Sequence, residues 1–338
     1  MHRVLVVGGG SIGERHVRCF LKTGRAEVSL CESRPERLGE LAANYPLSET
    51  YTDFGKVDLS RFDAAVICVP ANLHIPFARR VVEAGAHVLI EKPLSINLDG
   101  VAELEQAVQE KGLTAGVAYV RRAMRMFQMV RDLLASGKIG QLRSAVFVVG
   151  ADFRVARPDY QRIYFARRET GGGAVQDATS HMINLLQWLH GPVASVVASY
   201  DHLEIGSVDV EDTVSLLLRF RGNDTMANIH CNLWQAHREE NLTLLGRDGS
   251  IVGRLWEEKL GLFSRKSGTW EWTDVPRGIP DARGQVDEPF VNEADNFLDA
   301  IEGKADVFCT LSEARHTTQV CMAALESGLE GWAVQIEP

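Results

Sequence analysis

The first thirteen residues constrain the fold of this chain more than any other stretch. An apolar, β-branched run, Arg3 to Val7, leads directly into Gly8-Gly9-Gly10-Ser11-Ile12-Gly13. In a Gly-x-Gly-x-x-Gly turn, the first glycine permits the tight turn, the second lets a pyrophosphate approach the backbone, and the third lets the helix pack closely on the strand. A helix predicted over about residues 11–22 would offer its N-terminal N–H groups to phosphates. The pattern predicts a strand, turn and helix that bind a dinucleotide.

An acidic residue follows the second predicted strand. That strand covers Glu27 to Cys31, and Glu32 comes next. A dinucleotide-binding unit places a carboxylate at about this distance, where it bonds the ribose hydroxyls. Because a carboxylate repels the extra phosphate of NADP, Glu32 favours NAD. Ser33 and Arg34 leave NADP open as the alternative, because they are residue types that hold a 2′-phosphate. Arg34 is otherwise expected to be a solvated side chain at the start of the next helix.

Strands and helices alternate through the rest of the first third of the chain. The expected strands are Phe62 to Val69, His87 to Ile90 and Thr114 to Tyr119, and the expected helices run from Asn72, as N-cap, to Glu83 and from about Leu98 to Lys111. Alternation at this spacing is typical of a parallel, doubly wound sheet with helices on both faces. We therefore expect an α/β Rossmann domain over residues 1–120.

One of these strands leads into the turn Glu91-Lys92-Pro93. In open α/β sheets, ligands lie just outside the carboxyl ends of the strands, so this turn presents a carboxylate and an amine to such a ligand. The proline keeps Lys92 out of a helical conformation, because the residue before a proline is disfavoured in the α region. Lys92 is therefore a candidate catalytic residue. The alternative is a solvated lysine at the end of a strand.

From about Gln141 the pattern changes to many strands in succession. The candidates are Leu142 to Val149, Ala194 to Tyr200, Val214 to Phe220, Met226 to Cys231, Leu242 to Leu245, Ile251 to Leu255, Leu260 to Phe263 and Thr269 to Trp272. We expect an α+β C-terminal domain over residues 121–338, with a large, mostly antiparallel, open sheet for substrate binding and oligomerisation. Helices are expected near Val291 to Ile301 and at about 311–327, and the last is a candidate to pack back on the Rossmann domain.

The second half of the chain also contains an acid–histidine pair. After Gly171-Gly172-Gly173 a helix is expected to begin, and Asp177 and His181 stand at positions i and i+4, which places both side chains on one face. An amphipathic helix whose aspartate and histidine only pair with each other is the structural alternative. A dinucleotide site in the same chain favours the catalytic interpretation.

Five arginines lie close together between the first strand of that sheet and the glycines. The segment Asp152 to Arg168 contains Arg154, Arg157, Arg162, Arg167 and Arg168, with Tyr160 and Tyr164 among them. A carboxylate or phosphate on the substrate would explain them through bidentate contacts. Pairing with the acids of the protein or with a neighbouring subunit is the other explanation.

Composition excludes several classes of partner. The chain has 338 residues and a formal net charge of -9, which argues against a nucleic acid, whose phosphates demand a basic face. No apolar stretch approaches the length needed to cross a bilayer, and the N-terminus enters a strand directly, so no membrane partner and a cytoplasmic location are expected. The six cysteines show no Cys-x-x-Cys spacing or nearby histidine pairs. We expect small core residues and no metal site.

These motifs together resemble the glucose–fructose oxidoreductase and inositol dehydrogenase family, often written Gfo/Idh/MocA. The resemblance rests on the glycine turn, Pro70-Ala71-Asn72-Leu73-His74, Ala84-Gly85-Ala86-His87-Val88, Glu91-Lys92-Pro93 and Gly116 to Arg122, and it covers nearly the whole chain. Two positions differ from the family pattern. Asn184 stands where the family usually has aspartate, and Thr179 where it often has glycine, which bears on substrate identity.

The resemblance implies that Lys92, Asp177 and His181 line a nicotinamide pocket and carry the proton chemistry. We expect an NAD(P)-dependent dehydrogenase that oxidises a secondary hydroxyl of a sugar, polyol or sugar derivative, or runs the reverse reduction. His181 suits the role of a base near neutral pH, Asp177 would orient it, and Lys92 would bond the reacting oxygen. Two alternatives remain: a redox-assisted eliminase or glycosidase with tightly bound NAD, and a regulator that binds the cofactor without turnover.

The remaining expectations concern binding residues and partners. The cofactor, NAD in preference to NADP, is expected to contact Gly8, Gly10, Ser11, Ile12, Gly13, Glu32, Arg34, Pro70, Asn72, His74, Glu91 and Lys92. The candidates for substrate contact are Tyr119, Arg122, Arg154, Tyr164 and Asn184. Apolar side chains on both faces of Val214-Ser215-Leu216-Leu217-Leu218 predict self-association through the sheet, as a homodimer or homotetramer.

Overall fold

The structure is a computed structural model that describes residues 1–222, 224–281 and 284–337. The chain divides into two compact units: unit 1 is Met1–Ala123 with Gly278–Arg315, and unit 2 is Met124–Arg277 with His316–Pro338. The boundary expected near residue 120 lies close to Ala123, whereas residues 278–315, expected in the second domain, belong to unit 1. The last helix, α9 (Leu311–Glu330), is divided between the units, because its first turn belongs to unit 1.

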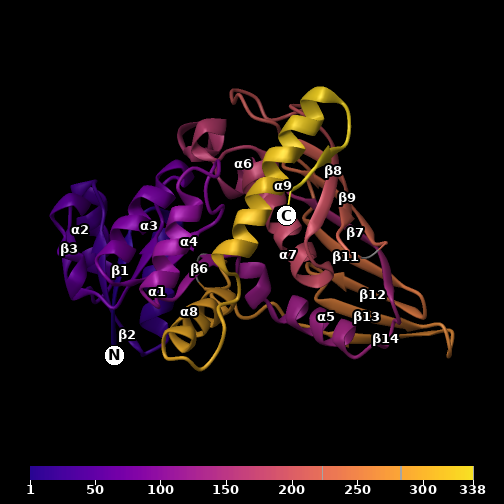
Figure 1. Ribbon diagram of the computed structural model, residues 1–338, viewed down its shortest axis with the longest axis horizontal. Coiled ribbons are helices and arrows are strands. Elements are labelled where there is room, and N and C mark those ends of the chain that lie inside the picture. The colour runs from indigo at the N-terminus through magenta and orange to yellow at the C-terminus, as the bar shows by residue number, and fades with distance from the viewer. Residues whose placement is uncertain (223, 282–283, 338) are drawn as a thin grey trace. The chain divides into compact units, whose positions relative to one another are not determined.

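Unit 1, which includes the indigo and purple part of the ribbon in Figure 1, contains a six-stranded parallel sheet with strand order β3-β2-β1-β4-β5-β6. The strands are β1 (His2–Val7), β2 (Ala26–Cys31), β3 (Thr50–Tyr51), β4 (Ala64–Ile67), β5 (His87–Glu91) and β6 (Ala115–Ala118). The strand order reverses between β1 and β4, and ligands of open α/β sheets bind at such a point. The expected Rossmann architecture is confirmed.

Helices cover both faces of this sheet. They are α1 (Ser11–Lys22), α2 (Pro35–Asn44), α3 (His74–Glu83), α4 (Val101–Glu110) and α8 (Glu288–Ile301). Along β1, Val4 and Val6 lie in one core cluster with Phe297 of α8, whereas Leu5 lies in the other with Leu104 of α4. This alternation follows the two-residue period of a strand, and burial of both faces explains its continuous apolar run. Phe297 and its neighbours also explain why α8 belongs to unit 1.

The helix expected from Asn72 to Glu83 begins two residues later. Asn72 lies in a 3-10 turn, Ala71–Leu73, and the N–H of His74 donates to the carbonyl of Ala71. The N-cap position of α3 is Leu73, with no side-chain capping bond. The prediction that Asn72 caps this helix is therefore wrong, because the preceding turn already satisfies the first N–H group. Other 3-10 turns are Phe54–Lys56, Leu59–Arg61, Val120–Ala123, Tyr160–Arg162, Tyr164–Ala166 and Arg168–Thr170.

Unit 2 contains a nine-stranded sheet with strand order β14-β13-β12-β11-β7-β10-β9-β8-β15. The strands are β7 (Leu142–Gly150), β8 (Val193–Asp201), β9 (Thr213–Phe220), β10 (Met226–Asn232), β11 (Glu239–Gly246), β12 (Gly249–Arg254), β13 (Lys259–Ser264), β14 (Thr269–Asp274) and β15 (Val334–Gln335). Neighbouring strands are antiparallel except β7 and β10, which are parallel. The expected large, mostly antiparallel sheet is confirmed.

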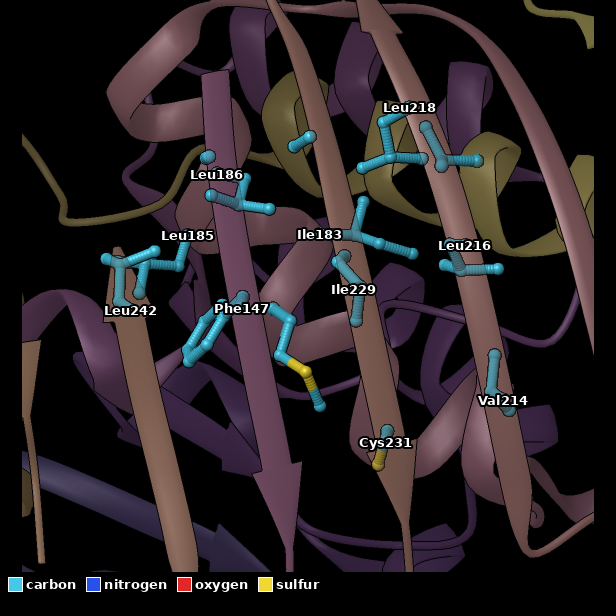
Figure 2. Close-up of a cluster of buried hydrophobic side chains, with 14 of the residues drawn as sticks. Phe147, Ile183, Leu185, Leu186, Val214, Leu216, Leu218, Ile229, Cys231 and Leu242 are labelled. Carbon is cyan, nitrogen blue, oxygen red and sulfur yellow. The ribbon is translucent and has the colours of Figure 1, made fainter. Parts of the chain in front are cut away.

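One face of this sheet is packed against helices. Unit 2 has α5 (Arg125–Ala135), α6 (Phe153–Ala156), α7 (Ser180–His190) and most of α9. Figure 2 shows Ile183 and Leu186 of α7 among side chains from the strands, including Phe147 and Ile229, and all four are buried. This layer is the core of unit 2. Among the helices of the described residues, none has the length and apolarity that crossing a membrane requires.

A buried ion pair joins α1 to the segment before α8 within unit 1. Arg18 donates to the two carboxylate oxygens of Asp287 at 2.6 and 2.8 Å, and Lys22 donates to the same carboxylate at 2.6 Å. The hydrogen bonds from Arg18 hold the pKa of the Asp287 carboxyl well below its usual range. A carboxyl with a lowered pKa stabilises the fold above its unfolded pKa, and this contribution is lost as the pH falls.

We expect Asp287→Asn to lower the free energy of unfolding by about 2 to 4 kcal/mol, because Arg18 would stay buried without its charge partner. The full decrease in the free energy of unfolding should be seen above about pH 5. The decrease should become smaller below about pH 4, where Asp287 of the unfolded chain takes up a proton. Urea unfolding across this pH range measures both effects. The control is Asp299→Asn, which breaks a more exposed pair with Arg25 and should cost less than about 1 kcal/mol. Equal losses in the two variants at neutral pH would contradict the prediction.

Candidate functional site

The glycine turn of unit 1 has the geometry that a dinucleotide requires. Gly8 has a φ of 100°, a conformation that favours glycine. A Cβ atom at Gly13 would lie 1.8 Å from the carbonyl oxygen of Gly8, so α1 begins in direct contact with the end of β1. A Cβ atom at Gly10 would meet no atom within 4 Å. Gly10 therefore faces open space, where a phosphate can reach the first N–H groups of α1, from Ser11 and Ile12 onward.

Glu32 is held beside this turn by backbone and side-chain donors. Its carboxylate accepts the N–H of Gly9 at 2.7 Å, the N–H of Arg34 at 2.9 Å and the guanidinium of Arg34 at 2.9 and 3.1 Å. Burial alone would raise the pKa of Glu32, but the hydrogen bonds from Arg34 and Gly9 lower it to about 2. Glu32 is thus a fixed negative charge at the position where the ribose hydroxyls are expected.

A cavity of about 720 Å³ opens at this end of the sheet. Its lining includes Gly8, Gly10, Glu32, Arg34 and Pro70 from the predicted cofactor set, and its size suits a large cofactor. It is also lined by residues that the sequence did not single out: Thr52, Asp53, Phe54, Phe77 and Arg80. These surround the end of β3, a two-residue strand too short to give a sequence pattern. The residues present fit a bound dinucleotide.

His74 and Asn72, predicted to touch the cofactor, are not among the residues lining this cavity. The ring of His74 is buried, with Nδ1 2.8 Å from the carbonyl oxygen of Pro93 and Nε2 2.8 Å from that of Val69. His74 therefore bridges the turn after β4 and the turn after β5. This placement supports a structural role for His74, because each ring nitrogen lies within hydrogen-bond distance of a carbonyl oxygen inside the protein.

Lys92 follows β5 directly and is half-buried, but Glu91 turns inward. One carboxylate oxygen of Glu91 lies 2.7 Å from Nε2 of His16, and the other accepts the N–H of Lys92 at 2.9 Å. Glu91 was predicted as a cofactor contact because its turn follows the carboxyl end of a strand, where ligands of open α/β sheets lie. Its carboxylate instead supports the turn from within the unit, since the last residue of a strand and the one after it point to opposite sides.

Tyr119 and Arg122, two candidates for substrate contact, are buried in unit 1. Arg122 donates to the carbonyl of Phe308 at 2.7 Å and to the carboxylate of Glu313 at 2.7 Å. These bonds account for a buried guanidinium without any substrate. Tyr119 lies in the core cluster that includes Leu104 and Val117.

In unit 2, Gly172 and Gly173 fit closely around the start of the helix that carries Asp177 and His181. A Cβ atom at Gly173 would lie 2.6 Å from the carboxylate of Glu211. Glu211 is buried, and its carboxylate accepts the N–H of Val175 at 2.8 Å and a guanidinium N–H of Arg168 at 2.8 Å. Burial raises the pKa of Glu211. This residue, which the sequence analysis missed, anchors the start of the helix; no local motif marks it.

The helix that carries Asp177 and His181 begins as a π-helix. The π-helical turn is Ala174–Thr179, and α7 continues from Ser180. The hydroxyl of Thr179 donates to the carbonyl of Ala174 at 2.7 Å, which gives a role to a residue where the family often has glycine. The i, i+4 prediction assumed a regular α-helix, whereas Asp177 lies in the π turn and His181 in the first turn of α7. π turns inside helices are frequent at functional sites.

Asp177 has a partner from the arginine-rich segment. The phenol of Tyr164 donates to Oδ1 of Asp177 at 3.0 Å. Asp177 is buried and His181 is half-buried. Asn184, one α-helical turn further along, is buried and donates to the hydroxyl of Thr317 at 3.0 Å. Tyr164 and Asp177 are therefore brought together, whereas Asn184 joins α7 to α9.

The arginines of 152–168 largely pair with acids of the protein itself. Arg154 bonds both carboxylate oxygens of Asp152 and lies 3.4 Å from the carboxylate of Glu204. Arg168 bonds Glu211, and Arg167 lies 3.5 Å from Glu169. For these three arginines, pairing with acids of the protein itself is a sufficient explanation, and no anionic substrate is required. Among the described residues, no cluster of three or more histidine, cysteine, aspartate or glutamate side chains is arranged to hold a metal ion.

Two family models match the chain. An oxidoreductase family model with an NAD-binding Rossmann fold covers residues 2–119, and the GFO/IDH/MocA C-terminal domain covers residues 127–252. Together they span most of the chain, so it belongs to the Gfo/Idh/MocA family of NAD-binding oxidoreductases. The expected family, enzyme class and cofactor are confirmed.

Several relatives carry the names of sugar or polyol oxidoreductases. The 1,5-anhydro-D-fructose reductase of Ensifer adhaerens is 25% identical over 342 residues, which cover 100% of this chain and 99% of that protein. The myo-inositol 2-dehydrogenase of Thermotoga maritima is 26% identical over 65% of each chain. The solved structure of levoglucosan dehydrogenase with NADH and levoglucosan has a TM-score of 0.88 at 21% identity, covering 100% of both chains. At this sequence identity, the similarity to levoglucosan dehydrogenase shows a common fold.

We expect NAD to bind at least about tenfold more tightly than NADP, because the fixed charge of Glu32 would face the 2′-phosphate. Glu32→Ala should reduce this difference by weakening NAD binding and strengthening NADP binding. Titration of NADH and NADPH by fluorescence measures both affinities. Tighter binding of NADPH to the wild-type protein would contradict the prediction and assign Ser33 and Arg34 to the 2′-phosphate.

Proposed function

We propose that this protein is an NAD-dependent oxidoreductase that moves a hydride between a secondary hydroxyl of a sugar, polyol or sugar derivative and nicotinamide. Lys92, Asp177 and His181 are the residues that handle the proton. The observation that carries the proposal is the turn Glu91-Lys92-Pro93, which ends β5 two strands from β1. The glycine turn and the cavity lie at the same carboxyl edge of this parallel sheet, where its ligands bind.

The contacts in unit 2 support the assignment of the base. Asp177 follows the anchored start of its helix, and Tyr164 holds one of its carboxylate oxygens. A carboxylate fixed in this way can orient a histidine one turn away and stabilise its cationic form. His181 is half-buried, so its ring is accessible in part. The pair therefore has the features of a base and its orienting acid.

The proton steps follow from these roles. When bound, the nicotinamide accepts a hydride from the substrate carbon or returns it. During oxidation, His181 accepts the proton of the hydroxyl, and Asp177 stabilises the imidazolium that forms. Lys92 donates a hydrogen bond to the same oxygen and stabilises its developing negative charge. In the reductive direction, His181 returns the proton and Lys92 polarises the carbonyl.

The named relatives define the first substrates to test. Levoglucosan and myo-inositol with NAD, and 1,5-anhydro-D-fructose with NADH, sample an anhydrosugar, a cyclitol and a ketose derivative. Net formation or loss of NADH supports an oxidoreductase. A sugar product without net NADH change would indicate the eliminase or glycosidase alternative, and cofactor binding without any turnover would indicate a regulator.

Lys92→Met should lower kcat by about two to four orders of magnitude while NADH binding stays within about twofold, because the side chain acts on the reacting oxygen. His181→Ala should lower kcat by a similar factor and flatten the acid limb of the pH profile, where protonation of the base inactivates the wild type. Initial rates from pH 5 to 10 with the active sugar measure both. Lys111→Met and His237→Ala, at exposed positions, are the matched controls. Wild-type rates and profiles in either catalytic variant would remove that residue from the mechanism.

We further propose that the protein self-associates through its nine-stranded sheet, by the face opposite the one that is packed against helices. One cross-strand row runs over eight neighbouring strands of this face. It consists of Val197, Leu217, Asn228, Val146, Thr243, Val252, Gly261 and Trp272. Val197 and Trp272 are 38% and 46% exposed. A row this long and this rich in apolar side chains is typical of an interface.

Sedimentation velocity at micromolar concentration should show a dimer or tetramer, and Leu217→Arg should shift the protein towards the monomer because the charge would lie within the apolar row. Leu203→Arg, at a 59% exposed position outside the strands, is the control and should leave the distribution unchanged. A clean wild-type monomer would exclude this interface.

A further inference from the structure

Two glutamates of unit 1 lie buried close to the turn that carries Lys92. Glu91 ends β5 and is 5% exposed, and Glu293 of α8 is 3% exposed. Both carboxyls lie close enough to Cys68 to affect its thiol. Burial raises the pKa of this thiol, and the neighbouring carboxyls of Glu91 and Glu293 raise it further. Two carboxylates in one water-poor layer repel each other, so only one of them is expected to carry a charge.

Hydrogen bonding decides which glutamate is charged. Each oxygen of Glu91 has a hydrogen-bond partner: Nε2 of His16 lies 2.7 Å from one, and the N–H of Lys92 donates to the other at 2.9 Å. The carboxyl oxygens of Glu293 accept no hydrogen bond from the described residues. Hydrogen bonds favour the charged form of a carboxyl, and their absence favours the neutral form. Burial and the neighbouring Glu91 raise the pKa of Glu293, so Glu91 is the carboxylate and Glu293 the neutral acid.

Contacts from two buried side chains, Glu91 and His74, hold the backbone before and after Lys92. The N–H of Lys92 is held by the Glu91 carboxylate, and the carbonyl of Pro93 lies 2.8 Å from Nδ1 of His74. The backbone around Lys92 is therefore held from both sides by buried side chains. A proton-transfer group needs this support, because a displacement of about 1 Å can cost about a hundredfold in rate.

We propose that the His16–Glu91 pair is a positioning element for Lys92, in which His16 orients the Glu91 carboxylate and the carboxylate fixes the backbone N–H of Lys92. This inference rests on the proposed function, in which Lys92 acts on the reacting oxygen. His16 lies on α1, one turn after Gly13. The helix whose N-terminus faces the cofactor phosphates thus also orients the acid that holds Lys92.

The test compares two isosteric changes at equally buried glutamates. Glu91→Gln presents an amide NH₂ to one of two donors, so one hydrogen bond is lost. We expect kcat to fall about ten- to a hundredfold, with KM and NADH affinity within about twofold. Amide hydrogen exchange of Lys92, measured by NMR in the NADH-bound protein, should accelerate at least about tenfold. Glu293→Gln replaces a neutral acid by a neutral amide of the same shape and should keep both wild-type values.

The outcomes separate this inference from the proposed function. Wild-type exchange and kcat in Glu91→Gln, or a larger loss in Glu293→Gln than in Glu91→Gln, would overturn the inference. If Glu91→Gln does not fold, His16→Ala is measured instead, and unchanged exchange at Lys92 together with unchanged kcat would overturn it. Wild-type turnover in Lys92→Met would contradict the proposed function, whereas the exchange measurement at Lys92 needs no substrate and stands by itself.

Discussion

The close approach of α1 to β1 at Gly13 is the constraint on which unit 1 depends. A Cβ atom at Gly13 would lie 1.8 Å from the carbonyl oxygen of Gly8, so the helix can start there only because the side chain is a hydrogen atom. This contact puts the N-terminus of α1 at the carboxyl edge of the sheet, where phosphates bind. One turn later it also places His16 against Glu91. One packing contact thus positions both the cofactor site and the support of the Lys92 turn.

In unit 2, a buried carboxyl side chain fixes the start of a helix. The start of the helix that carries Asp177 and His181 is fixed by Glu211, which accepts the N–H of Val175 and pairs with Arg168. Gly173 makes room for that carboxylate. The same segment that supplies Arg168 supplies Tyr164, which bonds Asp177. The arginine-rich segment therefore organises the helix start from within the protein, and its Arg154, Arg167 and Arg168 pair with the protein's own acids.

The sequence predicted those features that local patterns determine. The helix expected over 11–22 is α1, and most strands of both sheets were found with shifts of a few residues, because glycine turns and apolar periodicity are local signals. The two-residue strands β3 and β15 were not predicted, because they are too short to give a pattern. Features set by distant contacts were missed. The place of α8 in unit 1, the bonds of Glu211 and the inward turn of Glu91 each join residues far apart in sequence. The π turn at Asp177 also has no signature in hydrophobic periodicity, which the i, i+4 argument used.

The central proposal is that Lys92 and His181 act on one substrate hydroxyl. A crystal structure of the protein with NADH and the sugar identified by turnover tests this claim most directly. We predict Nζ of Lys92 and a ring nitrogen of His181 within about 3.2 Å of the same substrate oxygen, with Asp177 on the far side of the imidazole. A complex in which Lys92 contacts that oxygen while His181 lies beyond the reach of one bridging water would contradict the account.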